Sequence, residues 1–253
     1  MSASLLALVI AAVLVGAALQ RLSGTGVGLV VAPTLALAMG PGLGVFVTNA
    51  TTVVSGFLIM LSVLRDVDWK RWLVFAPMAV VGGVPAALLV RELGDGWLNI
   101  VIGAVVLLAL VMTFSLPRVP HVSGRGLPPV TAAAGMVGGF LNTAAGVAAP
   151  AMVIYSKLAR WEQRRFAATM QPTFMTMGLV SVGAKLSVGA TTVAQLPPLW
   201  LFPVIAVAVV GGIGAGTWLS RRVSAEAART VAIVLAGTGA LVALARGLFS
   251  LLG

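Results

Sequence analysis

Long apolar segments, separated by short polar connections, dominate this sequence of 253 residues. A helix that crosses a bilayer needs about 20 mainly apolar residues. Five runs have about that length: residues 44–64, 72–90, 97–116, 198–219 and 227–247. A sixth run at 166–187 is more polar and contains Pro172, but its length also fits. The sequence therefore predicts an all-α integral membrane protein.

The composition excludes several other classes of protein. Hydrophobic residues make up 60% of the chain and charged residues 9%, whereas a soluble domain has about 45–50% and about 25%. There is no cysteine and a single histidine, His121, so thiolate or histidine-cluster metal sites and a Cys nucleophile are excluded. All six acidic residues lie in polar breaks. We therefore expect no enzyme activity, no metal and no cofactor.

Two apolar regions are interrupted, which sets them apart from the six continuous runs. The first, residues 5–39, is too long for one crossing and is broken at residues 22–28. The second, residues 129–158, is broken at residues 142–146, which leaves pieces of 13 and 12 residues. Runs of about 10–14 residues suit re-entrant segments better than full crossings. The pattern predicts helical hairpins at 5–40 and 129–158.

The basic residues test this topology. If each hairpin returns to its own side, 12 of the 16 Lys and Arg residues share one face; if each crosses once, the split is 7 against 8. Because cytoplasmic loops carry an excess of Lys and Arg, hairpins are favoured, with the linker 117–128 cytoplasmic and both termini outside. If each broken region instead crossed the membrane twice, the connections would lie on the same sides and the charge distribution would be the same. The net charge of +10 is thus explained by membrane topology, and we expect no nucleic-acid partner.

The chain also contains an internal repeat. Residues 79–86 match residues 208–215 at an offset of 129, and residues 50–51 match 168–169 at an offset of 118. The two broken regions occur in the same order. We therefore predict a first repeat at 1–116, a linker at 117–128 and a second repeat at 129–253. One hairpin plus three crossings is an odd number, so the second repeat is inverted, an arrangement that recurs in secondary transporters.

The two helix breaks form the candidate binding site. Non-helical backbone at membrane depth survives only when it is buried in protein or lines a wet cavity. Two tips that enter from opposite faces would meet near the bilayer centre, where helix N-termini, hydroxyls and amides make an anion site. The candidate substrate-binding residues are Arg21, Ser23, Gly24, Thr25, Gly26, Gly28, Asn49, Thr51, Asn142, Thr143, Gly146, Thr169 and Gln171. Small residues at such breaks can also serve helix packing alone.

Two basic residues near apolar runs have two interpretations each. Arg21 follows a long apolar stretch and precedes the first break. It is either the counter-ion of a bound anion or a side chain that extends to water at the interface. Lys185 is expected near the outer end of its helix. It either attracts anions at the exit or anchors the helix at the interface, and we favour the anchor.

The motifs around the two breaks resemble a known family. The first is Gly24-Thr25-Gly26-Val27-Gly28 followed by Val31-Ala32-Pro33; the second runs from Gly138-Gly139 through Gly146 to Ala149-Pro150, with Arg165-Phe166-Ala167-Ala168-Thr169 opening the next helix. Together they resemble the sulfite exporter TauE/SafE family of bacterial membrane permeases, over about residues 5–245. The resemblance implies transport of sulfite, thiosulfate, sulfoacetate or another sulfonate or organic anion across the inner membrane.

These observations together predict a secondary transporter that exports a small anion by alternating access. An inside-negative potential drives anions outward by about 2.3 kcal/mol per charge per 100 mV. No Asp, Glu or His lies within an apolar run, so a proton relay is not expected. An anion-selective channel and a non-transporting membrane subunit remain the alternatives. The expected partners are the anion and the lipid bilayer, and a homo-oligomer is left open.

Overall fold

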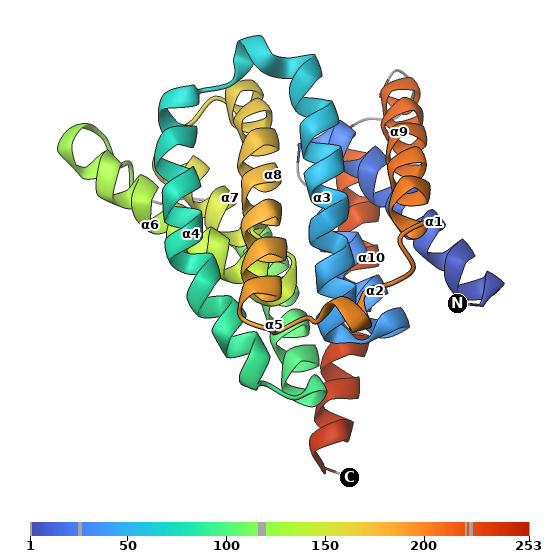
Figure 1. The fold of residues 1–253 in the computed structure, drawn as a ribbon. Helices are drawn as coiled ribbons and strands as arrows, with labels where there is room; N and C mark the ends of the chain where they lie inside the picture. The colour runs from blue at the N-terminus through green and yellow to red at the C-terminus, as the bar shows by residue number, and fades with distance from the viewer. Residues whose placement is uncertain (1, 25–26, 116–119, 221, 223–224, 253) are drawn as a thin grey trace.

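The structure is a computed structural model that describes residues 2–24, 27–115, 120–220, 222 and 225–252. These residues form ten α-helices and no strand (Figure 1). The helices are α1 (Ala3–Ser23), α2 (Val27–Met39), α3 (Pro41–Val63), α4 (Trp69–Glu92), α5 (Asp95–Ser115), α6 (Leu127–Ala145), α7 (Ala149–Leu158), α8 (Gln163–Ser187), α9 (Leu201–Leu219) and α10 (Ala225–Leu252). Three single turns of 3-10 helix, η1 (Leu64–Asp66), η2 (Gly124–Gly126) and η3 (Val193–Gln195), lie in the connections.

Five of the described helices are long and apolar enough to cross a membrane: α1, α3, α4, α9 and α10. Helix α8 has 25 residues but is more polar than these five. Large apolar side chains such as Leu73 and Val207 are exposed on the outside of the bundle, where lipid would cover them. The prediction of an all-α, multi-pass membrane protein is confirmed.

The bundle has two ends that differ in their connections. The end that carries η1 and residues 120–126 and 159–162 is called the linker face below. The opposite end, called the terminal face, carries the start of α1, the end of α10 and residues 188–200 (Figure 1). Helix α3 runs toward the linker face and α8 runs away from it (Figure 1). This antiparallel course is what an inverted repeat requires, and the inverted repeat itself stays a prediction.

Basic side chains mark the linker face. Arg65 lies in η1, Arg125 lies in η2, Lys157 lies in the last turn of α7, and Arg160 lies in the turn that follows α7. The connection between the repeats is tied to α7, because the backbone N–H of Val122 donates a hydrogen bond of 2.9 Å to the carbonyl of Leu158. Of the predicted linker 117–128, the structure describes residues 120–128. Which face is cytoplasmic stays a prediction.

Both hairpins have unequal arms and end their first helix on glycine. Gly24 ends α1 with φ 78° and Gly146 ends α6 with φ 74°, a left-handed conformation that glycine adopts without strain. Helix α6 therefore continues through Asn142 to Ala145, and the break begins only at Gly146. The predicted break at 142–146 and its 13- and 12-residue pieces were wrong: the arms have 19 and 10 residues. The alanines before Gly146 are good helix formers and extend the helix.

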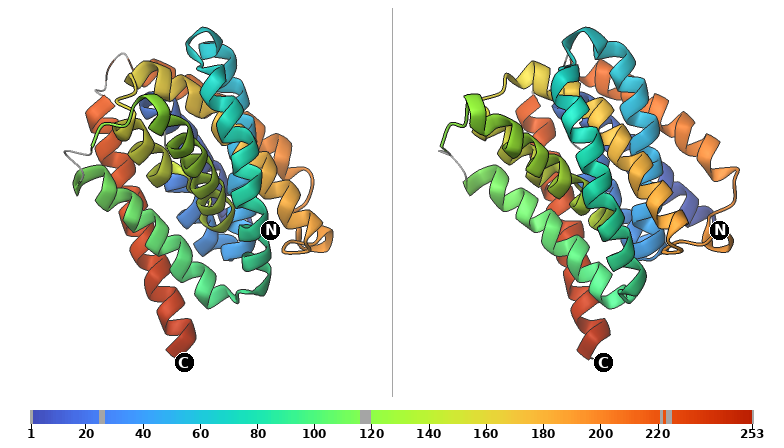
Figure 2. Two further views of the ribbon diagram at one scale, coloured as in Figure 1. Left: turned by 90° about the vertical axis from the view of Figure 1, so that its left-hand side faces the viewer. Right: turned by 60° about the vertical axis from the view of Figure 1, so that its left-hand side comes forward.

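Close packing between the two halves follows a reciprocal pattern (Figure 2). Helix α4 packs on α6, and α9 packs on α1. Gly82 of α4 lies against the carbonyl of Met136, and Gly212 of α9 lies against the carbonyl of Leu14, so closely that a Cβ would fit at neither position. Met136 follows Leu14 by 122 residues. A helix of each half thus packs on the first helix of the other half through a similar glycine contact. This similarity supports the predicted duplication.

Candidate functional site

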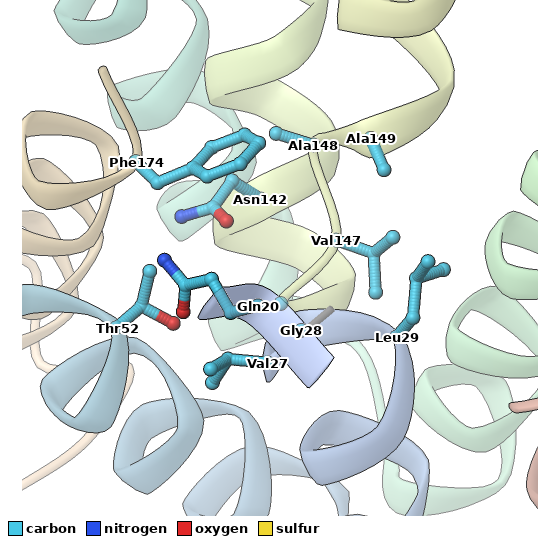
Figure 3. A pocket seen from close by; sticks show the side chains of 11 residues that line it. Gln20, Val27, Gly28, Leu29, Thr52, Asn142, Val147, Ala148, Ala149 and Phe174 are labelled. Atoms are coloured by element: carbon cyan, nitrogen blue, oxygen red, sulfur yellow. The ribbon is translucent and has the colours of Figure 1, made fainter. Parts of the chain in front are cut away.

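The tips of the two hairpins meet inside the bundle. Gly28, in the first turn of α2, faces the carbonyl of Gly146 at the end of α6, and a Cβ on Gly28 would overlap that carbonyl. Beside this contact is a cavity of about 20 Å³, which is space for about one water molecule. Its lining comes from both hairpins and from α3 and α8: Gln20, Val27, Gly28, Leu29, Thr52, Asn142, Gly146, Val147, Ala148, Ala149 and Phe174 (Figure 3).

A buried amide pair closes the first tip. The Nε2 atom of Gln20 donates a hydrogen bond of 2.8 Å to Oε1 of Gln171, and Ser55 Oγ donates one of 2.9 Å to Gln20 Oε1. Gln171 Nε2 donates in turn to the carbonyls of Gly24, at 3.3 Å, and Ala167, at 2.9 Å. One of the two N–H bonds of the Gln20 amide is therefore used by Gln171. The pair joins the end of α1 to α8.

A second amide pair closes the other tip. The Nδ2 atom of Asn142 donates a hydrogen bond of 2.7 Å to Oδ1 of Asn49. Asn49 Nδ2 donates to the carbonyl of Asn142 at 3.2 Å and to Ser181 Oγ at 2.9 Å. These side chains are buried, so each hydrogen bond satisfies a group that would otherwise be costly to desolvate. The pair joins the end of α6 to α3.

The two pairs are equivalent in sequence. Asn142 follows Gln20 by 122 residues, and Gln171 follows Asn49 by the same interval. Two neighbouring glycines, Gly56 and Gly178, are separated by the same interval of 122 residues. Gly56 of α3 lies against the carbonyl of Gln171, and Gly178 of α8 lies against the carbonyl of Asn49. The structure thus relates α3 to α8 by 122 residues. The predicted match of residues 50–51 with 168–169 is displaced by one helical turn.

A large vestibule opens at the linker face and ends on the first amide pair. Its volume is about 1210 Å³. Gln20, Gly24 and Gln171 line its inner end, and the 159–162 connection and Asp66 of η1 line its mouth. Gln20 lines both this vestibule and the small cavity between the tips. A solute that enters from the linker face would reach the Gln20 amide before the tip contact.

The vestibule wall carries more positive than negative charge. Its basic residues are Arg21, Lys157, Arg160 and Arg164, and its acidic residues are Asp66 and Glu162. The Nε atom of Arg164 forms an ion pair of 2.9 Å with Asp66 Oδ2. An excess of one sign of charge on the wall of a cleft raises the local concentration of counter-ions. The vestibule is therefore suited to collecting anions.

Arg21 lies in the vestibule wall, one residue beyond Gln20. Its Nε atom donates a hydrogen bond of 3.2 Å to Thr217 Oγ1 of α9, and its side chain is half-buried. Both interpretations of Arg21, a counter-ion in a wet cavity and a side chain that extends to water, stay predictions. Gly24, Gln171 and Asn142 of the predicted site also contact one of the two cavities.

Other predicted site residues lie elsewhere. Thr51 and Thr169 line neither cavity: their hydroxyls donate to the carbonyls of Val47, at 2.8 Å, and Arg165, at 2.7 Å. Such bonds one turn back along a helix are common for threonine. The hydroxyl of Thr143 is buried and has no hydrogen-bond partner among the described residues. Thr25 and Gly26 lie outside the described residues, as does the side chain of Ser23.

Several residues of the site were not predicted from the sequence. Gln20, Ser55 and Ser181 belong to the amide pairs. A polar residue such as Gln20 beside the first break was a usable signal, but its partner 151 residues away was not readable. Lys185 is 0% exposed, so the favoured prediction of an interfacial anchor was wrong. Tertiary packing of α8 against its neighbours decides that burial.

Comparison with known protein families gives a match over most of the chain. A family model described as "Sulfite exporter TauE/SafE" matches residues 8–244. No curated protein and no solved structure matches the chain significantly.

Proposed function

The chain belongs to the sulfite exporter TauE/SafE family, and we propose that it is a secondary carrier that exports a small anion by alternating access. The match covers residues 8–244 of the 253, so it includes both helix breaks and all the residues that line the two cavities. The family consists of membrane transporters for sulfur-containing anions. The proposed substrates are sulfite, thiosulfate, sulfoacetate or another organosulfonate or organic anion.

One observation carries the proposal of a carrier: the vestibule is wide at the linker face and closed at Gln20. Beyond Gln20 lies the cavity of about 20 Å³, and the contact between Gly28 and the Gly146 carbonyl is beside it. A carrier that works by alternating access is open to one side at a time. An open channel needs a continuous path instead. The arrangement therefore favours a carrier, with this structure as its state open to the linker face.

The groups near the closed end favour an oxyanion. Gln20 has one amide N–H beyond the one that it donates to Gln171, and Arg21, the next residue along α1, also lines the vestibule. A guanidinium matches the planar pair of oxygens of a sulfonate or carboxylate, and charge-assisted hydrogen bonds are stronger than neutral ones. We propose that Gln20 and Arg21 receive the anion, while Gln171 positions the Gln20 amide.

The charge distribution supports an orientation and a direction of transport. With the linker face in the cytoplasm, the basic vestibule opens to the compartment from which the anion leaves, and both termini lie outside. An inside-negative potential then drives the anion outward. In this proposal the protein resides in a bacterial inner membrane and needs no coupling ion.

The test is a current measurement on purified protein in liposomes. Sulfite, thiosulfate, sulfoacetate, sulfate, acetate and chloride are applied in turn, with protein-free liposomes as the control. The proposal expects a saturable current for one or a few sulfur-containing or organic anions. Equal, unsaturated currents for all of them, chloride included, would instead identify a channel.

A further inference from the structure

Lys185 is a basic residue that does not line the linker-side vestibule. It lies near the end of α8, half a helix away from Gln171, and none of its surface is exposed. Its Nζ atom has no hydrogen-bond partner among the described residues. An unpaired buried ammonium is unfavourable, and charged groups inside membrane proteins usually mark the path of a substrate. The position of Lys185 therefore calls for a conformation in which water or an anion reaches it.

Lys185 continues a row of residues on the face of α8 that packs against α3. Gly178, Ser181 and Lys185 recur at intervals of three and four residues, which places them on one side of the helix. Gly178 packs against the carbonyl of Asn49, and Ser181 accepts a hydrogen bond from Asn49 Nδ2. The row thus leads from the second amide pair toward the terminal face.

The two halves are related by an interval of 122 residues, so residues of this row can be paired with residues of the linker-side vestibule. Six residues that line the linker-side vestibule are Gln20, Arg21, Gly24, Ile59, Val63 and Gln171. The residues 122 positions away are Asn142, Thr143, Gly146, Ser181, Lys185 and Asn49. These counterparts are buried in this structure. Two of them, Thr143 and Lys185, also hold buried polar atoms without a hydrogen-bond partner among the described residues.

We propose that these counterparts line a second vestibule, which opens to the terminal face when the linker-side vestibule closes, and that Lys185 is its anion-binding cation. The inference rests on the proposed carrier function. Lys185 then serves the anion on the exit side as Arg21 does on the entry side. In the present conformation the second vestibule is closed, which explains why Lys185 Nζ and Thr143 Oγ1 are buried with no hydrogen-bond partner in the described part of the chain.

The chain contains no cysteine, so single cysteines can be introduced and labelled with a membrane-impermeant maleimide. Val63→Cys reports on the linker-side vestibule and Lys185→Cys on the proposed second one. Met177→Cys is the matched control, because Met177 is also fully buried in α8 and its counterpart, Ser55, does not line the vestibule. Labelling is measured by gel shift in spheroplasts and in inside-out vesicles.

The proposal expects Lys185→Cys to be labelled from one side of the membrane and Val63→Cys from the other, with Met177→Cys unlabelled from both. No labelling of Lys185→Cys from either side, or labelling from the same side as Val63→Cys, would overturn it. Labelling requires no known substrate. A native protein that carries no anion but still shows the expected labelling would refute the carrier function and leave the second vestibule in place.

A functional measurement separates a binding cation from a packing residue. Lys185→Met keeps the length and apolar stem of the side chain but removes its charge, and Lys185→Arg keeps the charge. For an anion that the native protein carries, we expect Lys185→Met to lose the current and Lys185→Arg to retain part of it. Full current with Lys185→Met would overturn the assignment of Lys185 as the anion-binding cation.

Discussion

The amide nitrogen of Gln20 lies 2.8 Å from Oε1 of Gln171, although 151 residues separate the two in the chain. This hydrogen bond joins the broken end of α1, in the first half, to the middle of α8, in the second half. Asn142 makes the same kind of bond to Asn49, but here the donor is in the second half and the acceptor in the first. Movement of one half against the other therefore acts directly on the two closed tips, where the proposed anion path is interrupted.

The first prediction concerns Gln20. Gln20→Leu keeps the approximate size of the side chain but removes the amide that lines both cavities and leaves Gln171 Oε1 without its donor. We expect transport to be lost and the free energy of unfolding to fall by about 1–3 kcal/mol, the cost of an unsatisfied buried group. Anion current and the melting temperature in detergent check this.

Ser55→Ala is the matched control for Gln20→Leu. It removes the other hydrogen bond of the Gln20 side chain but no group that lines either cavity. We expect a similar loss of stability with most of the current retained. Native current with Gln20→Leu would contradict the assigned role of this amide.

The second prediction concerns Arg21. Arg21→Ala removes a positive charge beside the closed end of the vestibule, so we expect weaker apparent affinity for the anion. Arg21→Lys should restore part of it, because the charge remains while the planar fork of donors is lost. Arg125→Ala deletes an equal charge in η2, away from the vestibule lining, and should leave the affinity unchanged. Equal effects of Arg21→Ala and Arg125→Ala would show that only net charge matters.

The third prediction concerns the glycine that ends α6. Gly146 has φ 74° and packs against Ala32. Gly146→Ala places a Cβ in the left-handed region, which costs about 1–2 kcal/mol, and the contact with α2 adds to this. We expect lower stability and reduced transport. Gly42→Ala, in α3 with open space around it, should be neutral or slightly stabilising, as measured by thermal unfolding.

The fourth prediction is a gain of transport rate on substitution of Asp66. Asp66 is an acidic residue at the vestibule mouth, and its partner Arg164 is 73% exposed. Such an exposed pair contributes about 0–1 kcal/mol to stability. Asp66→Asn should therefore leave the melting temperature almost unchanged while it raises the rate of anion uptake at low ionic strength. The gain should disappear as salt is added, since charges farther apart than about 10 Å are screened at 0.1 M. Slower uptake would contradict the role of the vestibule charge.

The sequence was sufficient to predict that the two apolar regions are broken near Gly24 and Gly146, because glycine-rich breaks are local features. That each region returns to its own side as a hairpin stays a prediction. Arg65 and Arg125, two of the basic residues that the sequence assigned to one side of the membrane, lie in connections of the linker face. The overall charge bias of that face stays a prediction. The ends of the breaks were less predictable: α6 continues past Asn142 because the alanines that follow favour helix, and only Gly146 reverses the backbone.

Pairings between helices were the part that the sequence did not reveal. The interval of 122 residues became visible through the contacts of Gln20 with Gln171 and Asn142 with Asn49, whereas apolar segments rich in Ala, Val and Gly align at several offsets. The burial of Lys185 likewise depends on which face of α8 packs against α3. An isolated helix gives no sign of that choice.

Counterflow tests most directly whether the protein carries an anion by alternating access. Liposomes loaded with unlabelled sulfoacetate receive a trace of labelled sulfoacetate outside, with the membrane potential held at zero; any other anion that gives a saturable current can replace it. The account predicts that the internal anion accelerates uptake of the label and that Gln20→Leu abolishes this acceleration. Uptake that rises linearly with concentration and is indifferent to the internal anion would contradict it.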